Sequence, residues 1–197
     1  MVVLKDKGSE ALEELMNQAQ MIATAAIRGG RQMEATLFLH GQEGNAILVP
    51  QKFDSEEAKD RFAEVSRIMC VAQGADAVVY CSEAWMVSPK KDKPLDLSVA
   101  PSKSPDRQEV LVLMGETREG CLHRSLPIHR AEGGKFAGFG EMTEIRPDSV
   151  GGRFANFLPE LTPTEEDRRL AKLYLAAKGI VPEEKRDKYR EQGRAMY

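Results

Sequence analysis

The sequence predicts an α+β domain built on a largely antiparallel sheet of about six strands. Along the 197 residues, two amphipathic helical segments alternate with strand-like segments in the order helix, two strands, helix and four strands. Short turns that contain glycine join the later strands, which is typical of antiparallel hairpins. Helices stabilise such a sheet by covering its apolar side, so we expect two helices packed on one face. A C-terminal helical tail follows the sheet.

The first helix is predicted by apolar residues that recur at helical spacing over residues 12–27. Ser9 lies where a side-chain oxygen can cap the helix, and Gly29 can end it. Two strands, 35–40 and 46–49, follow and are separated by a loop with a glycine at each end. We therefore expect these strands to form a hairpin.

A second helix is predicted over residues 54–73. Asp54 can cap its N-terminus, with Glu57 at the position that completes a capping box. Gly74 follows the periodic pattern and is expected to end the helix. The strand 77–87 comes next.

A strand, a proline-containing loop and a second strand occupy residues 77–117. The first strand changes from apolar residues to Ser82, Glu83 and Trp85, the only tryptophan of the chain. The loop, residues 88–104, contains three prolines and closes on a corner before the second strand. Polar and aromatic side chains at strand ends beside a long loop are common in binding sites, so this element is the first place to look for one.

Three consecutive antiparallel strands are predicted over residues 109–117, 121–130 and 135–145. The turns between them, 118–120 and 132–134, contain glycines that can adopt the positive φ of tight hairpins. These strands complete the predicted sheet.

The composition changes at the end of the segment 1–147, which we predict to be the α+β domain. Residues 148–197 are predicted to form a C-terminal helical extension. Near its start, Phe154, Phe157 and Leu158 provide enough apolar surface to dock on the domain.

The helix of the extension is predicted to start at Thr162, with Pro163 in its first position and Glu165 in its third. Gly179 is expected to end this helix. The charged segment 182–190 predicts a last short helix.

Composition limits the classes of partner. The net charge of −3, from 28 basic and 31 acidic residues, does not indicate a nucleic-acid surface, so no nucleic-acid partner is expected. No uncharged apolar run approaches the length of a membrane span, so no membrane association is expected. Cys70, Cys81 and Cys121 are widely spaced and are expected to be reduced thiols. These features predict a soluble, cytoplasmic protein.

No arrangement of residues identifies a reaction, so the catalytic residues are unknown, and neither a metal nor a cofactor is expected. Cys121, His123 and His129 share one strand face, but their separations match no zinc pattern. We expect this face to be polar and exposed to solvent. The glycine-rich segment 133–140 joins two strands rather than a strand and a helix, so it does not predict a phosphate site.

Ligand-binding candidates come from the strand–loop–strand element and from the end of the first strand. Glu83 is the most informative, because alternation places it on the face of Trp85. Its charge must be exposed or paired with an arginine such as Arg107 or Arg124. An ion pair that anchors the loop is the alternative role. The five candidates are Glu83, Trp85, Asp106, Arg107 and His40.

Three stretches carry a resemblance: SEAWMV at 82–87, PSKSPDRQEVLVLMGET at 101–117 and the strand around Pro127. The middle third of the chain thereby resembles an uncharacterised family of conserved hypothetical proteins from bacteria and phages. The resemblance implies a bacterial or phage origin and no assigned activity. The order of elements is also similar to that of roadblock and profilin-like modules, which serve dimerisation and ligand sensing.

These features predict a non-enzymatic binding or interaction module that forms a homodimer. Self-association, or a protein partner, is expected at the C-terminal helices. The alternative is a small hydrolase-type enzyme with a pocket at the element 77–117. Neither prediction specifies the ligand.

Overall fold

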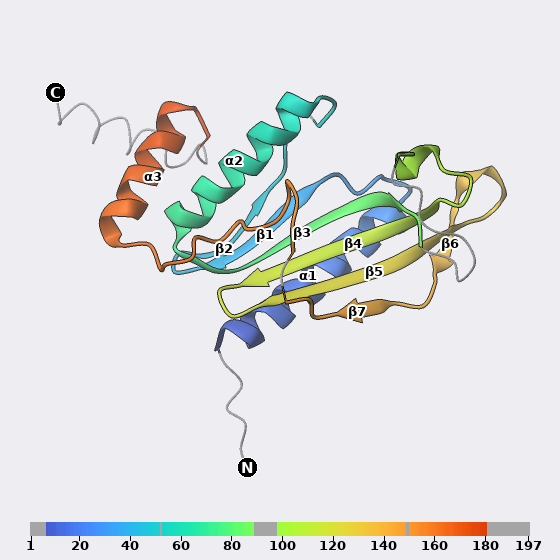
Figure 1. The fold of residues 1–197 in the computed structure, drawn as a ribbon, viewed down its shortest axis with the longest axis horizontal. Coiled ribbons are helices and arrows are strands. Elements are labelled where there is room, and N and C mark those ends of the chain that lie inside the picture. Colours follow the sequence, from blue (N-terminus) through green and yellow to red (C-terminus); the bar gives the residue numbers. More distant parts are fainter. Residues whose placement is uncertain (1–6, 52, 89–97, 149, 181–197) are drawn as a thin grey trace, which may run out of the picture.

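The computed structural model describes residues 7–51, 53–88, 98–148 and 150–180 (Figure 1). Its elements follow the predicted order and form an antiparallel sheet with helices, which confirms the α+β fold class. The helices and strands of the described ranges are α1 (Lys7–Arg28), β1 (Thr36–Gly41), β2 (Gly44–Leu48), α2 (Glu56–Gln73), β3 (Ala75–Met86), β4 (Gln108–Thr117), β5 (Cys121–Arg130), β6 (Phe136–Phe139), β7 (Thr143–Ile145) and α3 (Glu165–Ala177).

The strands lie in the order β2-β1-β3-β4-β5-β6 across the sheet, and β7 also pairs with β5. Neighbouring strands are antiparallel. The longest pairing joins β3 to β4, from Ala77 opposite Thr117 to Met86 opposite Gln108. The strand–loop–strand element therefore forms the centre of the sheet.

The single strand predicted over residues 135–145 is divided into β6 and β7, which corrects that prediction. The division lies beside Pro127 of β5, whose carbonyl oxygen accepts a hydrogen bond from the Gly140 nitrogen at 2.8 Å. The nitrogen and carbonyl of one strand residue point to the same side, and proline has no N–H to donate. Pro127 therefore interrupts the ladder along this edge of β5.

The helices differ from the prediction in one respect, because α1 and α2 cover opposite faces of the sheet (Figure 1). Helix α1 packs with the face that includes Val79, whereas α2 packs with the face of Val78 and Tyr80. Adjacent strand residues point to opposite sides. The runs 37–39 and 77–81 are buried at every position, so both faces of the central strands require a cover.

The C-terminal extension docks on the domain, as predicted, and the face that it contacts is the one covered by α2. Phe154, Phe157 and Leu158 pack into the core cluster beneath this helix. Helix α3 then lies along α2 and buries Ala171 and Leu175 against it (Figure 1). This side of the sheet therefore carries α2 and then α3 outside it.

The predicted starts of the first two helices are wrong by three residues and by one residue, respectively. Helix α1 begins at Lys7, so Ser9 lies within it. Helix α2 is capped by Ser55 rather than Asp54, because the Ser55 side-chain oxygen accepts a hydrogen bond from the Ala58 nitrogen at 3.1 Å. The capping signal was correctly located, but the choice between adjacent polar residues depended on local geometry.

The start of α3 is also displaced. Thr164, rather than Thr162, caps it and forms a capping box with Asp167. Gly74 ends α2 in the left-handed conformation, as predicted. The helix predicted over 182–190 lies outside the described residues. In the described ranges no helix combines the length and the apolar character needed to cross a bilayer.

Candidate functional site

Strands β3 and β4 bring Glu83 and Trp85 to one end of the sheet, on the face that α1 covers. Trp85 is paired with Glu109, and Glu83 is paired with Leu111. The Glu83 side chain is 6% exposed, whereas Trp85 is 44% exposed. Glu83 is thus a nearly buried acid at the end of a central strand, and it needs a partner for its charge.

Arg130, at the end of β5, is that partner, in place of the predicted Arg107 or Arg124. Its Nη2 atom lies 3.3 Å from Oε2 of Glu83. The same guanidinium donates from Nε to Oε2 of Glu109 at 3.0 Å and from Nη2 to the other oxygen. Arg124 is paired with other carboxylates. One cation therefore pairs with two carboxyl groups, which the registers of β3, β4 and β5 bring to the same end of the sheet.

The two carboxyl groups have opposite pKa shifts. Burial raises the pKa of Glu83, and the hydrogen bond with Glu109 adds to this increase, although the Met33 N–H, 2.5 Å from Oε1, opposes it. The hydrogen bond from Arg130 lowers the pKa of Glu109. A proton bound by this pair is held preferentially by Glu83, which can then donate a hydrogen bond or a proton.

Arg107 and Asp106 form the corner that closes the loop onto β3. The guanidinium carbon of Arg107 lies 4.9 Å from the centroid of the Trp85 ring. Arg107 also donates to the carbonyl oxygen of Ser102 at 2.9 Å, and the Asp106 nitrogen donates to the Ser104 hydroxyl at 3.2 Å. These contacts hold the corner against the sheet, so a structural role is sufficient to explain them.

His40 lies toward the opposite end of the sheet and does not share a site with the other candidates. It is paired with Ala77, six residues before Glu83 on β3, which is about 20 Å along the strand. Its Nδ1 atom lies 2.6 Å from Oδ1 of Asp76. The register shifts between His40 and Gly41, so Asp76 is an extra residue. Such a bulge redirects a side chain, here toward the imidazole.

The β5 face that carries Cys121 and His123 is partly buried, which corrects the expectation that it is exposed to solvent. Burial lowers the pKa of His123 and raises the pKa of Cys121. The C-terminal extension supplies the cover, because Glu116, paired with Cys121, accepts hydrogen bonds from the Phe157 and Leu158 nitrogens. Within the described ranges, no group of three or more His, Cys, Asp or Glu side chains is arranged to hold a metal ion.

A cleft of about 640 Å³ opens on the sheet face opposite Trp85, and Glu83 borders it. Its floor is formed by Ser82 and Ala84 of β3 together with two apolar residues of β4. Three segments outside the sheet form its walls: the α1–β1 linker, the approach to α2 with its first turn, and the start of the C-terminal extension. The cleft is therefore assembled from parts that are distant in sequence.

Aromatic rings form one wall of this cleft. The rings of Tyr80 and Phe154 stack at 4.8 Å between centroids with an angle of 3° between their planes. Phe53 lies 5.4 Å from Phe154, which extends the aromatic surface toward α2. Burial raises the pKa of the Tyr80 hydroxyl, so this group stays neutral at physiological pH.

Charged groups of both signs border the cleft. Lys59 and Arg153 are its cations, and each pairs with Glu56 of α2, at 2.7 and 2.6 Å respectively. Glu34 and Glu83 are the acids among its lining residues. Because Glu56 pairs with both cations, the lining offers no concentrated field for a highly charged ligand.

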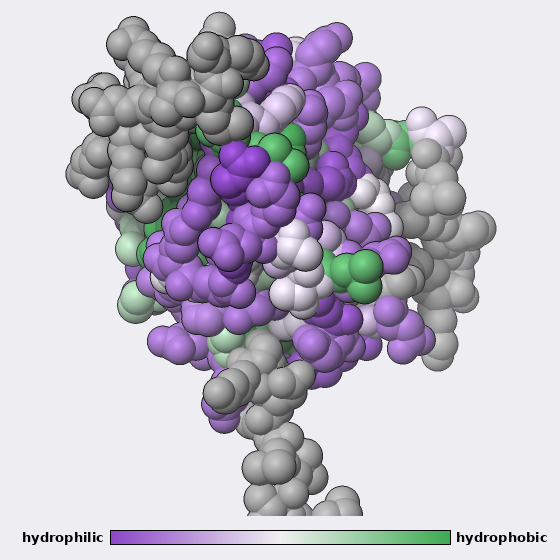
Figure 2. All heavy atoms as spheres, turned by 90° about the vertical axis from the view of Figure 1, so that its left-hand side faces the viewer, coloured by the Kyte–Doolittle hydropathy of each residue, from purple (hydrophilic) through white to green (hydrophobic). Residues whose placement is uncertain are grey.

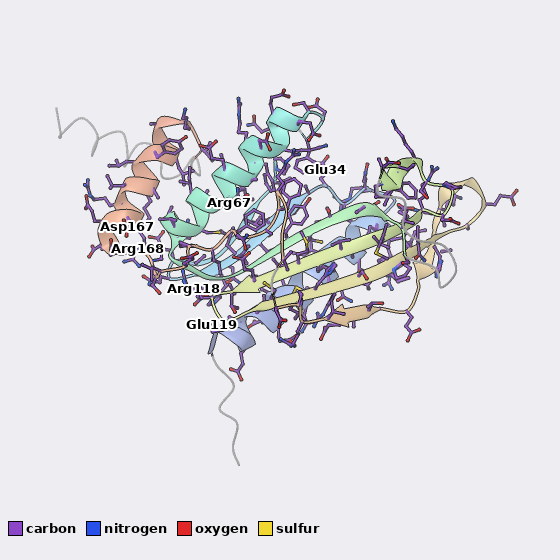
Figure 3. The ribbon with its side chains drawn as sticks, viewed as in Figure 1. Glu34, Arg67, Arg118, Glu119, Asp167 and Arg168 are labelled. Atoms are coloured by element: carbon purple, nitrogen blue, oxygen red, sulfur yellow. The ribbon has the colours of Figure 1, made fainter. Side chains whose placement is uncertain are left out.

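Arg67 fixes the part of the extension that forms the cleft wall. From α2 it points toward this segment (Figure 3). Its Nη2 atom donates to the carbonyl oxygens of Arg153 and Ala155 at 2.9 and 3.0 Å, and Nε donates to that of Asn156 at 3.2 Å. One guanidinium thereby satisfies three backbone acceptors, and it holds Phe154 in position against β3.

Of the five predicted candidates, the structure brings Glu83, Trp85, Asp106 and Arg107 to one end of the sheet, and only Glu83 borders the cleft. The aromatic wall was not predicted as a site. Tyr80 lies in a run of buried residues, and the contacts of Phe154 depend on how the extension docks. The remaining signal was the density of aromatic residues near the extension's start. Comparisons of the chain with protein-family models, curated proteins and solved structures found no match.

Proposed function

We propose that this protein is a non-enzymatic binding module whose ligand occupies the cleft between the sheet, α2 and the C-terminal extension. The observation that carries the proposal is a cleft of about 640 Å³ with an aromatic wall and a polar rim. Small-molecule sites have volumes of about 300–1,000 Å³ and combine an apolar lining with a few polar groups. The cleft meets both criteria.

The lining favours a small amphipathic molecule with a flat apolar part. The apolar part would lie against Val112, Met114 and the aromatic wall, where burial of its surface stabilises the complex. Ser82 and Gln51 can hydrogen-bond its polar groups. Because the cations of the lining are already paired with Glu56, a neutral or zwitterionic ligand fits better than a polyanion.

The test is to fill the cleft and measure binding. Ala84→Trp places a large side chain on the floor, and Ala131→Trp adds the same side chain at an exposed turn residue as the control. Binding of anilinonaphthalene sulfonate and of a set of small aromatic acids and amides would be followed by fluorescence and thermal shift. We expect the control to bind like the unsubstituted chain and Ala84→Trp to lose binding at least about tenfold, or about 1.4 kcal/mol. Equal binding by both variants would refute the proposal.

The second candidate function is a small hydrolase-type enzyme at the element 77–117. Glu83 favours it, because a nearly buried carboxyl group with a raised pKa beside the cleft can serve as a general acid. Chromogenic esters, phosphates and glycosides would be assayed with the unsubstituted chain, Glu83→Gln and Ala84→Trp. Hydrolysis that both variants lose would establish the enzyme. If the chain binds ligand in the cleft but hydrolyses none of these substrates, the result would favour the binding module over the enzyme.

The C-terminal helices are kept as the alternative surface for self-association or for a protein partner. Helix α3 uses Ala171 and Leu175 against α2, while Leu170 and Tyr174 stay exposed. Figure 2 shows that hydrophilic side chains dominate the visible surface at this end of the molecule and that hydrophobic residues form small patches. Leu170→Glu, compared with the unsubstituted chain by light scattering, measures whether this small surface contributes. An unchanged mass would exclude it.

We further propose a reducing, cytoplasmic location and no nucleic-acid partner. Cys70 and Cys81 are buried free thiols. Burial raises the pKa of Cys81 to about 12, which keeps it protonated and unreactive. Fractionation of the source cells and a heparin retention assay test these two points. A chain found outside the cytoplasm, or retained on heparin in a salt-dependent way, would contradict them.

A further inference from the structure

The outer edge of β2 is unpaired within the described residues, since β2 is the first strand of the sheet order and pairs only with β1 there. A free edge presents a row of backbone N–H and C=O groups that can pair with another strand. Natural edge strands are commonly protected by a charged side chain, a proline or a bulge. Residues 44–49 contain none of the charged residues or prolines that would do so. We propose that β2 is the dimerisation edge, where two copies of this chain continue the sheet by antiparallel pairing.

The side chains of this edge are exposed and aliphatic. Ile47 is 55% exposed and Val49 is 50% exposed. Both lie on the face of α1, because Ile47 is paired with Phe38 of the α1-side core. Together with Ile22 and Ala26 of α1, they border a groove of about 230 Å³. The helix thus leaves the edge uncovered and provides an apolar surface beside it.

The edge is complementary to itself when the two-fold axis passes through Ile47. In that register Ile47 faces its own copy, Asn45 faces Val49, and Ala46 faces Leu48. The pairs contain no like charges. The two copies of Ile47 and Val49 form one aliphatic cluster on the α1 face, and each groove receives part of it.

This self-complementarity is the reason to assign a second copy rather than a different protein as the partner. An isologous contact needs the same patch on both subunits, and it closes at two copies. A strand from another chain would need its own matching aliphatic and uncharged sequence, and nothing in β2 selects for one. The cleft opens on the other face of the sheet, and Gln32 and Met33 line both the cleft and the groove beside β2.

The first experiment compares Ile47→Lys with Ile145→Lys by sedimentation velocity and light scattering over a range of concentrations. Ile145 is the matched control, because it is an aliphatic residue, 51% exposed, at the end of another short strand, β7. In the dimer, two lysines at position 47 would meet at the axis. We expect Ile47→Lys to weaken the dimer about 100-fold or more, since like charges would be juxtaposed across the interface. Ile145→Lys should dimerise like the unsubstituted chain.

The second experiment tests the register. Cα atoms of directly opposed residues in antiparallel strands are about 4.5–5.5 Å apart, within the range that a disulfide bridges. Ile47→Cys should therefore form a covalent dimer under mild oxidation, whereas Ile145→Cys and the unsubstituted chain should remain uncrosslinked. Circular dichroism of each variant confirms that it is folded.

Three results would overturn the proposal. The unsubstituted chain could remain a monomer at all concentrations, or Ile47→Lys could leave a dimer unchanged. In a third outcome, Leu170→Glu abolishes the dimer while Ile47→Cys fails to crosslink, which would assign the contact to α3. If the β2 edge paired with a different protein, the purified chain alone would be a monomer, which is the first of these results. Ligand binding in the cleft is measured in a separate assay, so the results on dimerisation can be interpreted even if no ligand binds.

Discussion

Tyr80 of β3 and Phe154 of the C-terminal extension stack in parallel, with ring centroids 4.8 Å apart. The contact joins the centre of the sheet to a segment more than seventy residues further along the chain. It also forms a wall of the cleft. The stability of the fold and the shape of the candidate site therefore depend on the same pair of rings.

Phe154→Ala removes this contact. We expect a loss of about 2–4 kcal/mol in the free energy of unfolding, slightly below the loss for a fully buried phenylalanine, because Phe154 is only partly buried. Urea denaturation measures the loss. Leu161→Ala is the control in the same extension, since Leu161 is 82% exposed. A loss of similar size in both variants would show that the stacking has no special contribution.

Arg67→Ala should loosen the start of the extension. Three backbone carbonyls lose their donor, and we expect a destabilisation of about 1–3 kcal/mol. Hydrogen exchange should be faster at the amides of Phe157 and Leu158, which donate to Glu116. Glu116 remains in place, but the segment that carries the two amides would be less ordered. Arg61→Ala, at an exposed position of the same helix, is the control and should leave these exchange rates unchanged. Unaltered protection in Arg67→Ala would mean that the aromatic contacts alone hold the segment.

The Glu83–Glu109 pair predicts a dependence of stability on pH. The folded-state pKa of Glu83 is raised, so its contribution is fully present below the ordinary glutamate pKa and is lost as pH rises through the raised value. The folded-state pKa of Glu109 is lowered, so its contribution is present above the ordinary pKa and is lost as pH falls through the lowered value.

Glu83→Gln separates the two effects. The amide can accept from the Met33 nitrogen and donate to Glu109, as protonated Glu83 does. We expect the variant to gain stability relative to the unsubstituted chain as pH rises from mildly acidic to neutral, with urea denaturation at each pH as the measurement. Glu132→Gln, at an exposed turn position, is the control. Parallel pH curves for Glu83→Gln and the unsubstituted chain would contradict a raised pKa at this position.

Gly41 lies where β1 passes the end of α2. A Cβ atom there would be 2.7 Å from the carbonyl oxygen of Gln73 and 3.2 Å from the Cα atom of Ala75. Both are backbone atoms, so the clash cannot be relieved by a side-chain rotation. We expect Gly41→Ala to destabilise the fold by about 1–3 kcal/mol. Gly120→Ala has no atom within 4 Å of the added carbon and should change stability by less than about 0.5 kcal/mol in thermal or urea unfolding.

Much of the fold follows from local patterns of residues. Apolar periodicity predicted α1, α2 and α3, and alternating or apolar runs bounded by glycines predicted the strands. The strand 121–130 was predicted to the residue. These predictions succeed because hydrogen bonds within a helix, and turns between adjacent strands, involve residues that are close in sequence.

The candidate site was less predictable, because its contacts join residues that are far apart in sequence. Glu83 was identified as an acid that needs a partner, but Arg130 became that partner only through the registers of β3 with β4 and β4 with β5. His40 was grouped with the other candidates, although the sheet order places it toward the opposite end. A single sequence specifies neither register nor strand order.

Residue patterns thus predicted which segments are helices and strands and which residues are apolar enough to be buried. Docking decided the rest: the helices cover opposite faces because the central strands are apolar on both, and the extension returns to form the cleft with Tyr80 and Arg67. Such contacts join residues that are far apart in the chain. They arise from the burial of surface that several segments share, so they emerge only when the whole core assembles.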